Sequence, residues 1–195
     1  MRILIDNGHG AETKGKQSPD GRLKEWAYSR EIAHRVVAEL TRHGVMCSLL
    51  VGEDRDVRLS ERVGRANAIC RASGGRERCL LVSIHVNGAG SDGLWHTARG
   101  WQVCVSRNAS KASKQLAFNL TSAAERLGLK VRRPMATQPY WVQNLSICRD
   151  VVCPAILTEN LFQDNKEDVD FLLSEEGREA IVRVHVDGIL AYLAR

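Results

Sequence analysis

The chain has 195 residues, 44% hydrophobic and 26% charged, an ordinary composition for one globular domain with its own core. No apolar run approaches the about 20 residues that a membrane-spanning helix needs, so stable membrane insertion is not expected. The formal net charge of +5 favours anionic partners, but aromatic residues are only 5% and no basic run is interleaved with them, which argues against a nucleic-acid-binding protein.

The first half of the chain alternates between short apolar runs and amphipathic segments. The apolar runs predict strands, and apolar positions at helical spacing predict helices. Gly44 provides a stop for the first helix, and Ser60 or Asp56 could cap the second. The expected strands cover residues 2–6, 45–51 and 79–85, and the expected helices cover about 25–43 and 59–71.

The second half continues this alternation more loosely. Ser174 and the two acidic residues after it are typical of a helix start. Strands are expected over 101–106 and 153–159, helices over 109–127 and 174–193, and an irregular stretch over 128–150. Alternating strands and helices predict an α/β fold: a single domain, residues 1–195, with a mostly parallel twisted sheet flanked by helices on both faces.

The six cysteines lie mostly within apolar runs. None forms a Cys-x-x-Cys pair, which argues against a thiolate metal site. The even count would permit disulfides in an exported protein, but without a visible export signal we expect buried free thiols at Cys47, Cys70, Cys79, Cys104, Cys148 and Cys153.

Polar residues stand where ligands bind in open parallel sheets, beyond the carboxyl ends of the strands. His9 follows the first strand, His85 ends the third, and Glu159 ends the late one, while Glu25 opens the helix after the first strand. Two imidazoles and one carboxylate are a familiar catalytic zinc set that leaves a position for water. A second carboxylate would then act as general base.

Each of these residues also has a structural interpretation. His9 could occupy a tight turn between two glycines, and His85 could be a hydrogen-bonded core histidine. Glu25 could be a solvated acid in a first helical turn. The remaining histidines are weaker candidates. His34 and His185 are expected to pack or lie on the surface, His43 to end a helix, and His96 to be a minor candidate for substrate contact.

Several motifs resemble the zinc-dependent N-acetylmuramoyl-L-alanine amidases called amidase type 3, found in bacterial autolysins and phage endolysins. The resemblance spans nearly the whole chain. It rests on the segments 3–10, 82–87, 154–162 and 165–177 and on Glu25.

The resemblance implies that His9, Glu25 and His85 bind Zn2+ and that Glu159 is the catalytic glutamate. Asn87, in the same motif as His85, is expected to contact substrate. The chain departs from the family at Asn7 before Gly-His-Gly, in the 11–24 loop, and at 160–162, where the family has Thr-Gly-Phe. The short connection between His85 and the next strand predicts no long inserted helix over the site.

The implied activity is hydrolysis of the amide between the muramic acid lactyl group and L-alanine in peptidoglycan, by an autolysin or a phage endolysin. A zinc peptidase of the stem peptide and an inactive wall-binding module are the alternatives. We expect a monomer. The N-terminal run has the pattern of a strand, not an export signal, so synthesis in the cytoplasm without a visible signal peptide and action at the bacterial cell wall, in the periplasm or outside the cell, are expected.

Overall fold

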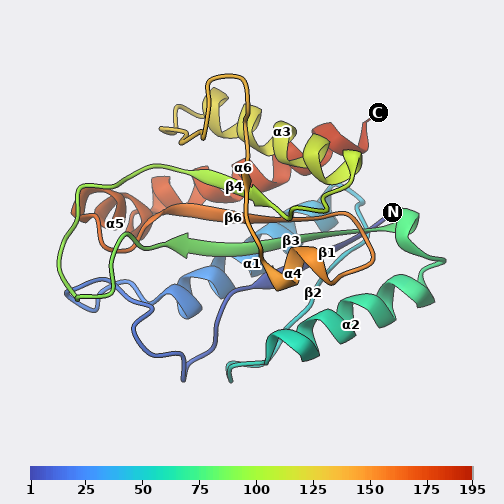
Figure 1. The fold of residues 1–195 in the computed structure, drawn as a ribbon, viewed down its shortest axis with the longest axis horizontal. Coiled ribbons are helices and arrows are strands. Elements are labelled where there is room, and N and C mark those ends of the chain that lie inside the picture. The colour runs from blue at the N-terminus through green and yellow to red at the C-terminus, as the bar shows by residue number, and fades with distance from the viewer. Residues whose placement is uncertain (195) are drawn as a thin grey trace.

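A computed structural model describes residues 1–194, which form an α/β fold around one twisted sheet (Figure 1). The strands are β1 (Arg2–Asn7), β2 (Cys47–Leu49), β3 (Cys79–Asn87), β4 (Gln102–Val105), β5 (Trp141–Val142) and β6 (Ala155–Phe162). Their order in the sheet is β2-β1-β3-β6-β4-β5. Neighbouring strands are parallel except β4 and β6, which are antiparallel. The predicted fold class is confirmed.

Helices cover both faces of this sheet. They are α1 (Glu25–Arg42), α2 (Leu59–Ala72), α3 (Lys111–Arg126), α4 (Ser146–Arg149), α5 (Lys166–Leu173) and α6 (Glu175–Leu193), with a 3-10 turn, η1, at Arg76–Arg78. Within residues 1–194, none of these helices is both long and apolar enough to cross a membrane.

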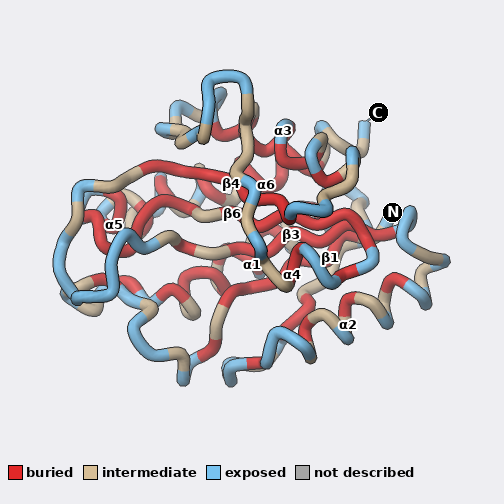
Figure 2. The backbone as a smooth tube through the Cα atoms, viewed as in Figure 1, coloured by how far each residue is buried: buried red, intermediate tan, exposed pale blue. Residues whose placement is uncertain are grey.

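Alternating residues of the central strands pack into two separate hydrophobic cores, one on each face of the sheet. Ile3 and Ile5 of β1 pack with residues of α1, α3 and α6 on one face. Leu4 of β1, Leu81 of β3 and Leu157 of β6 pack with α2 and α4 on the other face. Because side chains alternate along a strand, one strand contributes to both cores, and the central strands β1, β3, β4 and β6 are buried along most of their length (Figure 2).

Some predicted boundaries were wrong. Strand β3 runs to Asn87 and β6 to Phe162, so the two strands continue past His85 and Glu159 instead of ending there. The segment 128–150 is not wholly irregular, because it contains β5 and α4, and α5 was not predicted. Helix α2 begins after Arg58 without a side-chain cap, whereas the predicted cap of α6 is confirmed: Ser174 accepts a hydrogen bond from the Gly177 backbone.

A β-bulge in β6 coincides with one of the segments, 160–162, in which the sequence departs from the motif it resembles. His85 pairs with Glu159, but Asn87 pairs with Phe162, so β6 carries one extra residue at this point. Leu161 adopts φ 64°, a left-handed conformation that favours glycine. The Leu161 side chain is nevertheless buried in the α1/α3/α6 core, which compensates for the strained backbone.

The cysteines are free thiols, as predicted, and all but Cys47 are buried. Cys104, for example, is fully buried, and burial raises the pKa of its thiol to about 12. Such a thiol stays protonated at neutral pH and is a poor nucleophile.

Candidate metal centre and active site

Three ligand-type side chains from separate elements meet at one edge of the sheet. Glu25 Oε1 lies 3.1 Å from His85 Nδ1 and 3.3 Å from His9 Nε2. The three potential ligand atoms lie within 4.8 Å of one another, and the two imidazole rings are edge-to-face with centroids 5.0 Å apart. The structure thus brings together His9, Glu25 and His85.

Glycines make this close approach possible. A Cβ atom on Gly8 would lie 2.4 Å from the His85 ring, and one on Gly10 would lie 2.1 Å from the Asp56 backbone. Real Cβ atoms do not approach other atoms so closely, so any larger residue would push the rings or the loop away. The glycines on both sides of His9 are therefore required by space.

Glu25 is the most buried member of the cluster, with 1% of its side chain exposed. Burial by itself would raise the pKa of this carboxyl, but hydrogen bonds with His85 and His9 hold it below its ordinary value. The backbone N–H of Val86 also donates to Glu25 Oε1, at 3.0 Å. For His85, burial opposes the charged form, yet the Glu25 contact raises the pKa of the imidazole. Glu25 is therefore held as a carboxylate between two imidazoles.

Glu159 stands beside this cluster on β6, directly across from His85 of β3. One of its carboxylate oxygens, Oε2, is buried and has no hydrogen-bond partner among the described residues. Burial raises the pKa of Glu159 to about 7, with the His85 charge acting in the opposite direction. A carboxyl group that titrates near neutral pH suits proton transfer in both directions.

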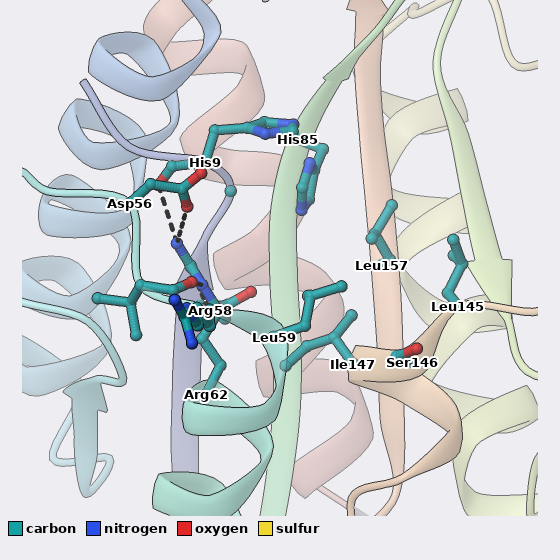
Figure 3. A pocket seen from close by; sticks show the side chains of 13 residues that line it. His9, Asp56, Arg58, Leu59, Arg62, His85, Leu145, Ser146, Ile147 and Leu157 are labelled. Atoms are coloured by element: carbon teal, nitrogen blue, oxygen red, sulfur yellow. Dashed lines mark hydrogen bonds and ion pairs between the residues drawn. The ribbon is translucent and has the colours of Figure 1, made fainter. Parts of the chain in front are cut away.

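A cavity of about 330 Å³ opens next to the two histidines (Figure 3). It lies on the α2/α4 face of the sheet, and its walls combine apolar side chains with His9 and His85. The apolar walls include Leu59, Leu145, Ile147 and Leu157. A substrate could thus reach the cluster along this face.

Comparison with known proteins gives the family. A model described as N-acetylmuramoyl-L-alanine amidase, amidase type 3, matches residues 3–191. The chain belongs to this amidase family. The residues predicted to carry the chemistry all lie within the matched part.

Relatives of this amidase family support the assignment over nearly the whole chain. An endolysin of Bacillus phage SPP1 is 28% identical over 98% of this chain and 65% of the endolysin, so the chain spans about two thirds of that relative. The amidase CwlM of Bacillus licheniformis is 25% identical over 97% of this chain and 67% of CwlM. A solved amidase structure from Clostridium difficile 630 has a TM-score of 0.82 at 25% identity, covering 99% of this chain and 96% of that one.

Asn87 lies two residues beyond His85 in β3, partly exposed and on the same face of the strand. Its side-chain oxygen accepts a hydrogen bond from the Gly88 backbone at 2.9 Å, which leaves the amide NH2 as its free donor. The connection between β3 and β4 contains no helix, as predicted, so none covers the site from there.

The sequence interpretation missed Arg62 and Asp6, which form a buried ion pair directly beneath the His9 loop. Their Nη1 and Oδ1 atoms are 2.7 Å apart. The signal was present: Arg62 shares a helical stripe with the buried residues Ala66 and Cys70, where an arginine needs a partner.

Other histidines play no part in this cluster. His34 is exposed, and His43 follows α1 near Glu39. His96 pairs with Asp92 at 2.9 Å. His185 is fully buried: its Nδ1 donates to the Ile181 carbonyl at 2.7 Å, so Nε2 of the neutral ring accepts the Thr158 hydroxyl at 2.9 Å.

His185 predicts a pH dependence of stability. Burial lowers the pKa of His185 from 6.5 to about 4. As the pH falls, the unfolded chain therefore binds a proton at this residue at a higher pH than the folded chain does. The stability that His185 contributes above pH 6.5 is lost as the pH falls toward 4. Between pH 7 and pH 5 the protonation of His185 in the unfolded chain should lower the free energy of unfolding by about 2 kcal/mol. Urea unfolding should show that His185→Gln removes this part of the pH dependence. His34→Gln is the exposed control, and an equal slope in both variants would contradict the assignment.

Proposed function

We propose that the chain is a zinc-dependent N-acetylmuramoyl-L-alanine amidase, with residues 1–195 as its single catalytic domain. It would hydrolyse the amide between the muramic acid lactyl group and L-alanine in peptidoglycan. The observation that carries the proposal is the His9–Glu25–His85 cluster beside Glu159, in a chain of this amidase family.

The residues present fit a zinc ion. The donor set is two imidazole nitrogens and one carboxylate oxygen, all close enough for one ion. Glu25 Oε2 is buried and has no hydrogen-bond partner among residues 1–194, as expected of an oxygen in a metal site. A bound zinc would lower the pKa of a water molecule to about 7 and polarise the scissile carbonyl.

Glu159 is proposed as the general base and acid. Its unpartnered oxygen could accept the proton of the attacking water. The same carboxyl could then return that proton to the nitrogen of L-alanine as the amide breaks. A pKa raised by burial suits both steps, because neither protonation state is strongly favoured at neutral pH.

The cavity of about 330 Å³ on the α2/α4 face is the proposed path of the substrate. Apolar side chains such as Leu59 and Ile147 would contact the methyl groups of the substrate. Asn87 would donate its free amide hydrogens to a substrate carbonyl or hydroxyl. The positive net charge would attract the anionic polymers of a cell wall.

Digestion of purified peptidoglycan tests this function. The amidase should release intact stem peptides with an N-terminal alanine, and a chelator should abolish the release until Zn2+ is added back. Mass spectrometry and N-terminal sequencing identify the products. Cleavage within the stem peptide would favour a zinc peptidase instead, and binding without any product would favour a wall-binding module.

The setting of the reaction is also proposed. We propose that the chain works as a monomer at the bacterial cell wall, in the periplasm or outside the cell. Synthesis in the cytoplasm without a signal peptide would suit an endolysin, whereas export would suit an autolysin. Neither nucleic acid nor membrane insertion enters this function.

A further inference from the structure

Two buried arginines converge on the backbone of His9. Arg62 of α2 donates from Nη2 to the His9 carbonyl oxygen at 2.9 Å. Arg30 of α1 donates to the same oxygen from Nη1 and Nη2, each at 3.1 Å. Because α1 and α2 cover opposite faces of the sheet, a helix from each side contributes to one carbonyl. The arginines are 7% exposed for Arg30 and 2% for Arg62.

The backbone of His9 is in an unfavourable conformation. Its φ is 61°, in the left-handed region that residues with a Cβ atom rarely adopt. Such a conformation persists only where the surroundings enforce it, and it is common at functional sites. The direction of the His9 carbonyl, and with it that of the imidazole, depends on this backbone geometry.

The guanidinium of Arg62 is also held by bonds to groups other than the His9 carbonyl, and these bonds fix its position. Its guanidinium also bonds the Asp6 carboxylate at 2.7 Å and the carbonyls of Asn7 and Val57 at 2.5 Å and 2.8 Å. Asp6 in turn accepts the Ser83 hydroxyl from β3 at 2.5 Å. In Figure 3 the Arg62 side chain lies below the His9 loop, with dashed lines leading up toward it.

Arg30 is fixed in the same way on the other side. It donates to the Glu53 carbonyl at 2.7 Å and to the Trp26 carbonyl at 3.1 Å. Burial, and then the charge of Arg62, lower the pKa of Arg30. Each guanidinium has an acidic partner, Asp6 for Arg62 and Asp54 at 3.6 Å for Arg30, and both still converge on the His9 carbonyl oxygen.

We propose that Arg62 and Arg30 are positioning residues that hold His9 in its left-handed conformation and so preorganise the metal site. The inference rests on the proposed metal role of His9. The two guanidiniums act through the His9 carbonyl and are not among the three potential metal ligands, although Arg62 also lines the cavity beside the histidines. Residues that orient a metal ligand in this way typically change metal affinity by about 10–100-fold.

Arg62→Lys and Arg30→Met test the proposal in the full chain. Lysine can keep the ion pair with Asp6, but its three N–H donors sit on one nitrogen, so it cannot span the Asp6 carboxylate and the His9 carbonyl as the forked guanidinium does. Arg30→Met leaves no buried carboxylate unpaired, so it covers the case in which Arg62→Lys fails to fold. Zn2+ affinity is measured by competition with a chromophoric chelator, and the Co2+ absorption spectrum reports the ligand geometry.

Arg65→Lys is the matched control. Arg65 lies on the same helix and pairs with Glu53 and Glu61 at the surface, without contact to His9. We expect Zn2+ affinity to fall about tenfold or more in Arg62→Lys and Arg30→Met, with an altered Co2+ spectrum, and to stay at the parent value in Arg65→Lys.

Parent-like affinity and spectra in the folded variants would overturn the positioning role, as would an equal loss in Arg65→Lys. Failure of the parent chain itself to bind zinc would instead refute the proposed metal set, and this inference with it.

Discussion

Glu159→Gln is expected to retain zinc and to lower peptidoglycan hydrolysis by about 10²–10⁴-fold, the usual contribution of a general base. The substitution keeps the shape of the side chain but removes its ability to take a proton. One oxygen of the Glu159 carboxylate is buried beside His85 and has no hydrogen-bond partner among the described residues. Turnover is measured as released N-terminal alanine, and zinc content by metal analysis of the same sample.

Glu77→Gln is the control for this prediction, because Glu77 is exposed, in η1 at the other end of β3. It should leave both turnover and zinc content unchanged. Undiminished turnover in Glu159→Gln would remove Glu159 from the mechanism. Loss of zinc together with turnover would mean that Glu159 acts as a ligand and not as the base.

Gly8→Ala should disable the metal site. The new methyl group would lie 2.4 Å from the His85 ring, so the ring or the loop must leave the position in which His85 faces Glu25 and His9. We expect Zn2+ affinity to fall by about 10–100-fold. Hydrolysis should fall in parallel when the zinc concentration is too low to saturate the variant. Chelator competition and the digestion assay measure the two effects.

Gly52→Ala is the matched control, because a Cβ atom at Gly52 meets nothing within 4 Å and its backbone is not left-handed. It should bind zinc as the parent does. If Gly8→Ala bound zinc equally well, the close packing of the loop against His85 would be irrelevant to the site.

Much of the fold was predictable because local patterns coincide with tertiary structure. The long helices and central strands have clear periodicity, so the sequence predicted these elements, and only their predicted ends differ from the observed ones. Strand β5 has two residues and helix α4 has four, which is too few to show a hydrophobic periodicity in the sequence. Helix α5 did carry a signal, since Asn165 caps it and accepts a hydrogen bond from the Asp168 backbone.

The candidate site was predictable where residues follow strands, and less so where they act through packing. His9 was proposed from its place just after β1, His85 and Glu159 from their places on β3 and β6, and Glu25 from the start of α1. The buried network around Arg62 joins residues 56 positions apart, as with Asp6, so the helical stripe indicates that Arg62 needs a buried partner but does not identify that partner. Neither the bulge at Leu161 nor the left-handed backbone of His9 is visible in sequence, because both are set by tertiary contacts.

The short outer strands of the sheet have a further consequence. β2 has three residues and β5 two, so each border offers few free backbone groups to a strand from another molecule. Long open borders promote strand exchange and fibril growth, and short ones resist both. The sheet therefore resists self-association through its borders.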